Sequence, residues 1–503
     1  MSHKKRALWL ATRDLRLSDN PALIKIAALY DVTCLFVLDE RLLRSSQVGM
    51  NRLSFLLESL VDLRKSLREI GSELFFRQGH YEREVLLVVK ETQAEEVHIL
   101  NDFSGYAKSR YERLYELLKL EGVSLIGHPG TSIIEPGLLC PKAGGSHFKI
   151  FTPYYRVWEN TDRRDLYPRI DRLDTTFDKD PGNIPDVEEL KRQVKTFLKN
   201  NGRPSDTALY KERCKFLLHI SPDRDRGGEQ KAHETLNQFI SSKALFSYGQ
   251  SSNDLGSAGT SRLSSYLHFG CISPLEVEKA VIRAYLDLDN PFLSGGITKD
   301  SVSTVDPDVY NIYKTKNDIS AEAESDDAAL SVASFIRQLC WRDFYLQFAA
   351  AFPDIQKADY RPRAIGWIDD EAQLLSWMNG ESGEEIVDAA MAQLIREGFV
   401  HNRARLIASS YLTKTLRIDW RYGLSHYNCL LTDADYASNA GNWQWMAGTG
   451  TDTRPNRTLN PKRQQERFDP NGTYRTRYLR HSLNSKPSPL PPQTGKKYQQ
   501  KLF

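Results

Sequence analysis

Residues 7–38 read ALWLATRDLRLSDNPALIKIAALYDVTCLFVL, and this stretch decides the fold of the N-terminal part. Two apolar runs, ALWL and VTCLFVL, flank the helical pattern PALIKIAALY. Asp19 or Asn20 before Pro21 indicates the start of that helix, with a capping side chain and then a proline in the first turn. A strand, a helix and a second strand in this order are typical of a parallel sheet wrapped by helices.

The alternation continues to about Gly130. An amphipathic stretch over 52–69 is followed by the short apolar runs LFF, EVHIL and VSLIG. We therefore expect an α/β domain over 1–130, with a parallel sheet flanked by helices. The glycine-rich fingerprint of dinucleotide-binding folds is absent after the first apolar run, so nicotinamide binding is not inferred.

A chain of 503 residues is too long for one hydrophobic core, so two or three domains are expected. Residues 131–205 are rich in turn sequences with little periodicity, which predicts a connector lying across the surface. Helical spacing from 206 onward predicts a large all-α domain over 206–480. Inside it, 286–330 is expected to be a flexible acidic insertion, and the proline-rich tail 481–503 to be disordered.

Composition narrows the class of protein. The 68 Lys and Arg residues nearly balance the 65 acids, which argues against histone-like behaviour but leaves room for a local basic groove. The six cysteines lie far apart without a CxxC pair, so no local spacing for a zinc or iron–sulfur cluster is present, and a reducing compartment is indicated. The sequence contains neither a leader-like segment nor an apolar run of about 18 residues, which predicts a cytoplasmic protein without a membrane span.

Tryptophan is concentrated in the helical half. The stretch ASNAGNWQWMAGTGTD, residues 437–452, places two indoles two positions apart among polar neighbours. A lone indole is more often part of a core than of a site. Here Asn439, Asn442 and Gln444 provide more polar partners than a plain apolar core requires, which favours a binding site.

Two further clusters point to an anionic ligand. In GTSRLSSYLHFG, residues 259–270, hydroxyls near a helix start suit a phosphate, although ordinary helix capping gives the same pattern. In EGFVHNRARLIASSYL, residues 397–412, Asn402 and Arg405 fall on one helical face. Because the arginines interrupt an otherwise apolar helix, at least one is expected to meet an anion inside the domain.

Seven blocks of the sequence carry a resemblance to a known family: RDLRLSDNPAL (13–23), GTSRLSSYLHFG (259–270), WRDFY (341–345), EEIVDAAMAQLIREGFVHNRAR (384–405), RIDWR (417–421), DADYASNAGNWQWMAGTGTD (433–452) and NPKRQQERFDPNG (460–472). In order and spacing these blocks resemble the DNA photolyase and cryptochrome family, most closely its class I cyclobutane pyrimidine dimer photolyases. The resemblance covers nearly the whole chain. It implies an α/β antenna domain, a long connector and a helical domain that holds FAD.

The family resemblance implies a light-dependent repair enzyme, a deoxyribodipyrimidine photolyase. In this family, light-excited reduced flavin passes an electron to a pyrimidine dimer, and the protein supplies orientation and electrostatics. Trp443, Trp420 and Trp367 match an electron-transfer chain from the flavin to the surface. Trp341 and Trp445 match the indoles that hold a flipped-out lesion, since flat apolar walls replace lost base stacking.

The same carry-over implies an FAD site. Arg405 and Asp433 are expected to be partners near the isoalloxazine, where a fixed cation stabilises the anionic reduced flavin. Asn439 matches the residue facing the flavin N5, where an amide can accept a hydrogen bond from a protonated N5; this favours a repair enzyme or a bacterial-type flavin over a plant-type photoreceptor. The implied FAD-binding residues are Tyr248, Thr260, Ser261, Arg262, Leu263, Ser264, Gln338, Arg342, Asn402, Arg405, Asp433, Asp435 and Asn439.

UV-damaged DNA is the implied partner of a monomeric protein. Its binding is expected to depend on phosphate contacts and therefore on salt, with selectivity coming from the ease of flipping a damaged dimer. The residues expected at the DNA are Trp341, Trp445, Asn402, Arg403, Arg457, Lys462, Arg463 and Gln464. For Lys462 and Arg463, a solvated basic surface explains the sequence equally well.

Two departures bear on the lesion. Gln338 stands where cyclobutane dimer enzymes carry a glutamate, as in the branch that repairs six-four photoproducts. The six-four branch uses a histidine pair in the block that reads His401–Asn402 here, so its proton donor has no counterpart. We therefore expect cyclobutane dimer repair, with Asn402 and Gln338 contacting the lesion; six-four repair and a cryptochrome-type blue-light photoreceptor are the alternatives.

Smaller departures affect the periphery. Phe399 replaces a tryptophan, Thr12 an arginine, and Asn456 an aromatic residue before Arg457, which weakens DNA contacts more than the fold. The segment 101–114 lies where the family seats a second, antenna chromophore. A deazaflavin is expected there, with a folate or an empty site as alternatives. The short proline-rich tail lacks a hydrophobic partner face, which favours the enzyme over the photoreceptor.

Overall fold

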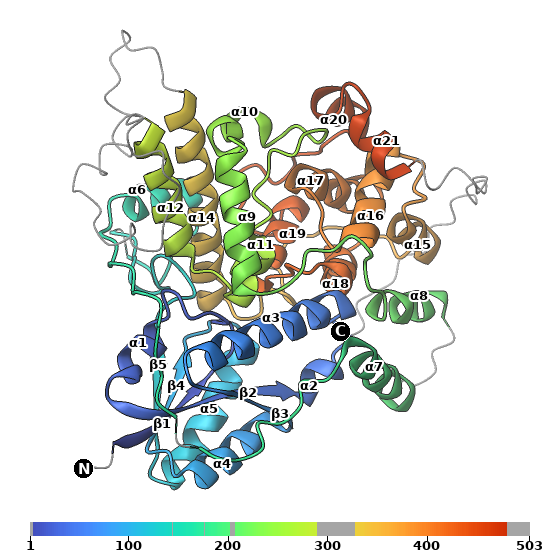
Figure 1. Cartoon of the computed structure of the whole chain (residues 1–503). Helices are drawn as coiled ribbons and strands as arrows, with labels where there is room; N and C mark the ends of the chain where they lie inside the picture. Colours follow the sequence, from blue (N-terminus) through green and yellow to red (C-terminus); the bar gives the residue numbers. More distant parts are fainter. Residues whose placement is uncertain (1–3, 143, 176, 202–206, 289–326, 480–503) are drawn as a thin grey trace.

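The computed structural model describes residues 4–142, 144–175, 177–201, 207–288 and 327–479. An α/β part lies beside a larger helical body (Figure 1), as the sequence predicts. The five strands of the α/β part form one parallel sheet in the order β3-β2-β1-β4-β5. The strands are β1 (Lys5–Leu10), β2 (Tyr30–Asp39), β3 (Leu74–Gly79), β4 (Glu96–Leu100) and β5 (Ser124–His128).

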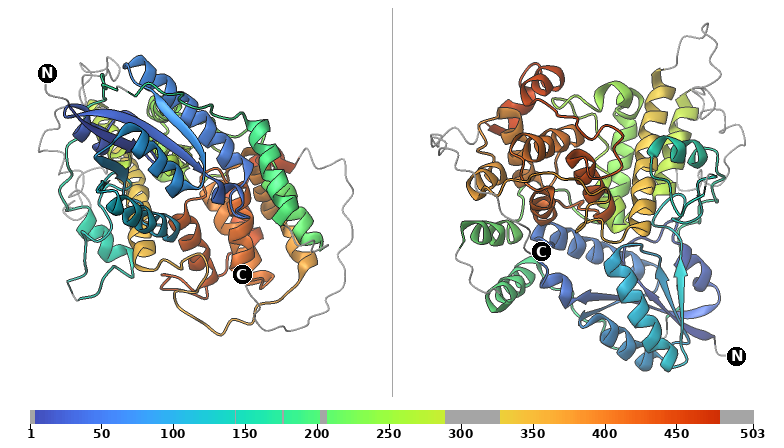
Figure 2. Two further views of the ribbon diagram at one scale, coloured as in Figure 1. Left: turned by 90° about the horizontal axis from the view of Figure 1, so that it is seen from below. Right: turned by 180° about the vertical axis from the view of Figure 1, so that it is seen from behind.

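Side-chain alternation along the strands gives the sheet two buried faces. Leu8 and Leu10 of β1 pack with helices α4 (Tyr81–Thr92) and α5 (Gly105–Leu120) on one face. Trp9 points to the other face, whose core runs through α1 (Pro21–Ala27) and α3 (Met50–Glu69) into the helical body. Figure 2 shows α3 lying between the sheet and that body. A parallel sheet buried on both faces accounts for the continuous apolar runs of the sequence.

The expected start of the first helix is confirmed, and the choice of cap is settled. The Asn20 side chain accepts hydrogen bonds from the N–H groups of Ala22 and Leu23, and Pro21 occupies the first turn. Asp19 instead has a φ of 44° and binds Arg164 through its carboxylate. A short helix, α2 (Glu40–Leu43), follows β2.

The connector is more helical than its turn-rich sequence indicates. It contains α6 (Phe151–Trp158) and α7 (Val187–Asn201). In α6, Phe151, Tyr154 and Trp158 are buried at i, i+3 and i+7, so this stretch carries the helical period that the surrounding turns obscure. The prediction of little periodicity over 131–205 is therefore wrong at these two helices.

The helical body contains η1 (Leu245–Ser247) and η4 (Tyr411–Thr415) besides its α-helices. Those α-helices are α8 (Ala208–Leu217), α9 (Glu229–Ser241), α10 (Tyr248–Ser251), α11 (Ser264–Phe269), α12 (Pro274–Leu288), α14 (Asp327–Ala351), α15 (Glu371–Asn379), α16 (Glu385–Glu397), α17 (Asn402–Ser410), α18 (Trp420–Leu430), α19 (Tyr436–Ala447), α20 (Pro461–Phe468) and α21 (Thr473–Leu479).

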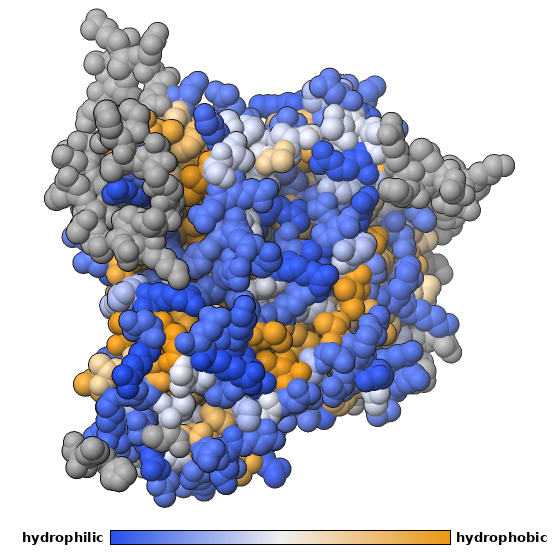
Figure 3. Space-filling view, in the orientation of Figure 1, coloured by the Kyte–Doolittle hydropathy of each residue, from blue (hydrophilic) through white to orange (hydrophobic). Residues whose placement is uncertain are grey.

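Two sequence predictions fall largely outside the described residues. Of the acidic insertion expected over 286–330, the ends 286–288 and 327–330 are helical, in α12 and α14, and the rest is not described. The tail 481–503 also lies outside the described residues. No described helix is long and apolar enough to cross a membrane. Figure 3 shows a mostly hydrophilic face with apolar residues gathered where the two parts meet.

Candidate active site

One cavity of about 430 Å³ opens in the helical body. Residues from α14, α17, α18 and α19 and from the segment before α11 line it, so regions far apart in the sequence converge there. Its volume is within the range of small-molecule sites. Every residue that the sequence assigns to FAD lines it: Tyr248, Thr260, Ser261, Arg262, Leu263, Ser264, Gln338, Arg342, Asn402, Arg405, Asp433, Asp435 and Asn439.

The hydroxyl-rich segment at 260–264 faces the cavity. The N-cap of α11 is Leu263, whose side chain makes no capping hydrogen bond, while the Ser261 hydroxyl accepts the Leu263 N–H at 3.4 Å. Thr260, Ser261 and Ser264 all line the cavity, so their hydroxyls are within reach of a ligand there. These hydroxyls can hydrogen-bond a phosphate or ribityl chain.

Arg262 is held by the protein itself. Its guanidinium donates to Glu397 at 2.6 Å and to Asp225 at 3.2 Å, and it stacks 4.0 Å from the centre of the Phe399 ring. Its backbone lies at φ 57°, in the left-handed region. Arg262 therefore shapes the cavity wall, with its charge already balanced by two carboxylates.

Arg405 and Asp433 form the ion pair that the sequence predicts. The Nη2 of Arg405 donates to both carboxylate oxygens of Asp433, at 2.7 and 3.0 Å, and its Nε donates to the Val400 carbonyl at 2.7 Å. Asp433 is buried and Arg405 is half-buried. The pair is thus a fixed, mostly desolvated charge arrangement in the cavity wall, where its field is screened little by water.

A second charge cluster joins the cavity to the α/β part. Arg13, from the RDLRLSDNPAL block, donates to Asp435 at 2.8 Å and lies 3.5 Å from Asp102. Burial alone raises the pKa of Asp435, but His268, whose Nδ1 lies 3.7 Å from the carboxylate, and the charges of Arg13 and Arg342 hold that pKa well below its usual range. Asp435 is therefore ionised, and it caps α19 by accepting two backbone N–H groups.

His268 and Arg342 complete this cluster. Burial, together with the charge of Arg13, lowers the pKa of His268 to about 4, so this imidazole is neutral at pH 7. Arg342 donates to the carbonyls of Thr131 and Leu267, and burial lowers its pKa. Arg342 is consequently a partly buried cation at the cavity, held by backbone oxygens.

Two half-buried indoles line the same cavity. One face of Trp341 is covered by Phe151 of α6, with ring centroids 3.6 Å apart and planes 4° apart. Arg457 lies 5.0 Å above the ring of Trp445. Asn402, at the start of α17, and Gln338 of α14 are exposed side chains in the lining of this cavity. The structure thus brings the predicted lesion-facing residues together.

The three tryptophans of the predicted electron chain are buried to different degrees. Trp443 and Trp420 are 2% and 0% exposed, whereas Trp367 is half-buried in the loop before α15. The loop of Trp367 is tied to the segment before α18, because Ile368 N–H donates to the Arg417 carbonyl at 2.7 Å. A Cβ added at Gly423, one turn after Trp420, would lie 2.2 Å from the Trp443 indole. Trp443 is therefore packed directly on α18.

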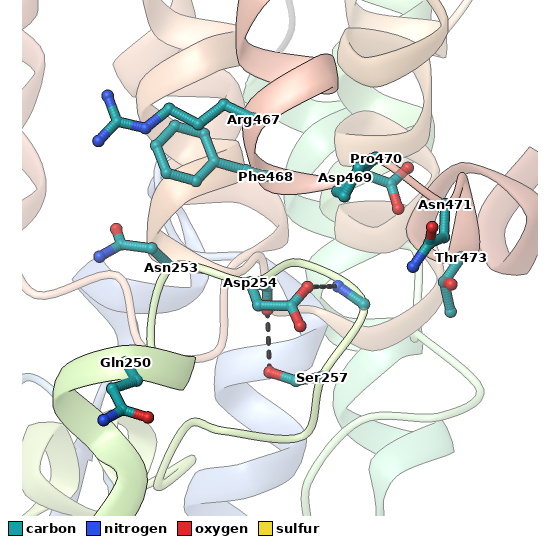
Figure 4. A pocket seen from close by; sticks show the side chains of 11 residues that line it. Gln250, Asn253, Asp254, Ser257, Arg467, Phe468, Asp469, Pro470, Asn471 and Thr473 are labelled. Atoms are coloured by element: carbon teal, nitrogen blue, oxygen red, sulfur yellow. Dashed lines mark hydrogen bonds between the residues drawn. The ribbon is translucent and has the colours of Figure 1, made fainter.

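The predicted basic DNA contacts lie outside the cavity lining. Arg403 donates to Asn253 at 2.5 and 3.1 Å and stacks on Phe468. Asn253 and Phe468 belong to a second, polar cavity of about 490 Å³, drawn in Figure 4. Arg457, Lys462 and Arg463 are exposed, whereas the side-chain oxygen of Gln464 is buried without a partner among the described residues.

Comparison with known proteins agrees with this arrangement. The family described as "DNA photolyase" matches residues 7–171, and the "FAD binding domain of DNA photolyase" matches residues 335–496. A deoxyribodipyrimidine photo-lyase of Streptomyces griseus is 38% identical over 474 residues, spanning 93% of this chain and 88% of the relative. The chain belongs to the photolyase and cryptochrome family.

Both branches of the family are among its relatives. A cryptochrome DASH of Gloeobacter violaceus is 29% identical over 95% of this chain and 86% of its own length. The crystal structure of a bacterial class III photolyase from Agrobacterium tumefaciens superposes with a TM-score of 0.73, at 28% identity, over 95% of this chain and 87% of that one.

The cavity of this family member fits FAD chemically. Arg342 and Arg405 offer cations, the 260–264 segment offers hydroxyls, and aromatic rings form apolar walls. The buried hydroxyl of Tyr427, another lining residue, has no hydrogen-bond partner in the described part of the chain. An orphaned buried hydroxyl is costly unless a ligand satisfies it, which points to a polar occupant.

Several residues at this photolyase-type site escaped sequence analysis. Phe151 lies in the connector, where turns hide the helix that carries it. Tyr427 and Trp377 flank Trp443 with ring centroids 5.1 and 6.1 Å away, but as isolated aromatic residues they are indistinguishable from core. Asn428 hydrogen-bonds Asn439, a contact between α18 and α19 that no spacing rule reveals.

The segment expected to seat an antenna chromophore lies at the carboxyl end of the sheet. It begins after β4, and its Tyr106 donates to Asp39 at the end of β2. Arg110 stacks 4.1 Å from the ring centre of Tyr81. Ligands of open parallel sheets bind at this edge, so the position suits a chromophore.

Proposed function

We propose that this protein is a light-dependent DNA repair enzyme that splits cyclobutane pyrimidine dimers flipped out of UV-damaged DNA. One observation carries the proposal. The half-buried Trp341 and Trp445 line the same cavity as the buried Trp443 and Asn439, so a lesion at the indoles would lie close to a cofactor deeper in the cavity. Reduced FAD, when bound and excited by blue light, supplies the electron that opens the cyclobutane ring.

The residues of the chain have separate tasks in this proposal. Trp341 and Trp445 stack on the flipped-out bases and replace the stacking that the duplex loses. Arg405 and Asp433 hold a fixed charge pair beside the isoalloxazine, and Arg342 with the 260–264 hydroxyls binds the phosphate and ribityl part. Trp443, Trp420 and Trp367 pass electrons inward from the surface.

Two neighbouring residues favour the cyclobutane dimer over the six-four photoproduct. Asn402 lines the cavity and can hydrogen-bond a thymine carbonyl, but it cannot act as an acid. His401 uses its Nδ1 as the N-cap acceptor of α17, and its Nε2 is buried without a partner in the described residues. Burial, with the charges of Arg403 and Arg405, lowers the pKa of His401 to about 4, which makes it a weak proton donor at pH 7.

Binding of damaged DNA and of a second chromophore belongs to the same proposal. Arg457 beside Trp445, with Lys462 and Arg463 on α20, would contact phosphates at the mouth of the cavity. The segment 101–114 would seat a deazaflavin, or alternatively a folate, at the edge of the sheet.

The test of lesion type uses the purified, photoreduced protein and two oligonucleotides. One carries a cyclobutane thymine dimer and the other a six-four photoproduct, and both are incubated in blue light and in darkness. Light-dependent restoration of the cyclobutane substrate alone is expected. Repair of the six-four substrate alone would mean that Gln338 rather than Asn402 decides the lesion, and repair of neither by a flavin-loaded protein would favour the photoreceptor.

A further inference from the structure

A chain of side-chain hydrogen bonds runs from the α/β part to Asn439. Gln47, in the loop between α2 and α3, donates through Nε2 to the Ser425 hydroxyl at 3.3 Å. Its Oε1 accepts a hydrogen bond from Asn428 Nδ2 at 3.0 Å. The Oδ1 of Asn428 then accepts from Asn439 Nδ2 at 2.8 Å. Each amide thus accepts from the next one along the chain.

This chain of hydrogen bonds fixes the orientation of the Asn439 amide. Because donors and acceptors must alternate, no amide can turn over unless its neighbours turn as well. One of the two N–H groups of Asn439 Nδ2 donates to Asn428, which turns this nitrogen toward Asn428. Among the described residues, the Oδ1 of Asn439 accepts no side-chain hydrogen bond. Asn439 is 8% exposed and lines the cavity, so its oxygen is free to accept a hydrogen bond from a ligand there.

The chain of hydrogen bonds is anchored at its other end, at Ser425. The Ser425 hydroxyl also accepts a hydrogen bond at 2.7 Å from Arg213, which can only donate. Arg52 clamps the backbone, since its Nη2 donates to the carbonyls of both Gln47 and Asn428. Asn428 is 3% exposed. This network orders both amides before any ligand enters the cavity.

We propose that Gln47 and Asn428 are positioning residues that turn the Asn439 oxygen toward N5 of the bound flavin and thereby set the flavin's reduction potential. This inference rests on the proposed function, because it requires FAD in this cavity. An acceptor oxygen stabilises a protonated N5 and opposes an unprotonated one. Reduction protonates N5, so the oriented amide favours the reduced cofactor that repair requires.

The test measures the reduction potential of bound FAD by redox titration in wild-type protein and three variants. Asn428→Leu removes both hydrogen bonds of Asn428, and Gln47→Met removes the acceptor that orders it. Both are expected to lower the potential. A tenfold loss of preference for the reduced form corresponds to about 30 mV for a two-electron couple.

The matched control is Gln47→Glu. Its carboxylate still accepts from Asn428 Nδ2, so the order of the chain is kept and the potential is expected to stay near that of the wild type. FAD content and the free energy of unfolding, measured for each variant, separate misfolding from a change in orientation. The inference is wrong if Asn428→Leu leaves the potential unchanged, or if Gln47→Glu shifts it as far as Gln47→Met.

Failure of the proposed function has a different signature. A wild-type protein that binds FAD but repairs no dimer would refute the repair proposal, while the potentials of the variants would still decide the role of Gln47 and Asn428. A protein that holds no FAD after reconstitution would overturn both proposals.

Discussion

Phe151 and Trp341 lie ring on ring, with centroids 3.6 Å apart and planes 4° apart. The guanidinium of Arg337 also lies over the Phe151 ring, 5.1 Å from its centre. The connector, which the sequence predicts to be only a link between domains, therefore contributes the ring that packs on the cavity-lining indole of Trp341. Trp341 is held in one orientation by its own protein, and its remaining surface is left for a ligand.

Replacing Phe151 by leucine is expected to weaken binding of dimer-containing DNA. An aromatic pair contributes about 0.5–1.5 kcal/mol beyond its buried area, which corresponds to roughly 2–12-fold in the dissociation constant. Fluorescence anisotropy with damaged and undamaged oligonucleotides measures the effect. Only the damaged substrate should lose affinity, and FAD content should not change; an equal loss for both oligonucleotides would mean that Phe151 acts on the fold rather than through Trp341.

Gly423→Ala is expected to slow photoreduction of bound flavin. The added Cβ would lie 2.2 Å from the Trp443 indole, so the ring must shift, at a cost of about 1–3 kcal/mol for overpacking. Absorbance during illumination with an external reductant measures the rate. Val61→Ala is the control, because Val61 of α3 is 57% exposed and its truncation displaces no ring. A normal rate in Gly423→Ala would argue against Trp443 as the step next to the flavin.

Arg13→Met is expected to destabilise the protein by about 3 kcal/mol, because Asp435 and Asp102 would lose the cation between them. The double variant Arg13→Met/Asp435→Asn should recover part of the loss, since it leaves one uncompensated carboxylate fewer. Denaturant unfolding of the single and double variants gives the coupling energy. Simple additivity would show that the two residues do not stabilise the junction as a pair.

Buried His426 is expected to make the folding stability of the protein sensitive to acid. Burial first, with the charge of Arg213, lowers its pKa from 6.5 to about 3, so between these values the unfolded chain binds more protons and stability falls as pH falls. From pH 7 to pH 5 this histidine accounts for about 2 kcal/mol. His426→Phe should remove that share of the loss without breaking a hydrogen bond, as neither ring nitrogen has a partner among the described residues. Unfolding curves at both pH values test this; equal losses in variant and wild type would contradict it.

The sequence predicts some of this architecture and misses other parts for identifiable reasons. Asn20 and Pro21 predict the start of their helix because capping is a local interaction. Arg405 and Asp433 lie in recognisable blocks, so their meeting follows from the family pattern. The Phe151–Trp341 stack and the Gln47–Asn428–Asn439 chain are contacts between segments hundreds of residues apart, and neither depends on a local period. Such contacts require the folded chain.

The most direct test of the central claim compares dimer binding with light-driven splitting in one set of proteins. Wild-type protein, Trp341→Ala and Trp341→Phe are photoreduced and mixed with a cyclobutane dimer oligonucleotide. The wild type and Trp341→Phe, which keeps an aromatic wall, should bind and repair it in blue light and not in darkness. Trp341→Ala should bind it about 5–150-fold more weakly, which corresponds to about 1–3 kcal/mol for a stacking contact. Splitting in darkness, or undiminished binding by Trp341→Ala, would contradict a lesion seated at the Trp341 wall of the flavin cavity.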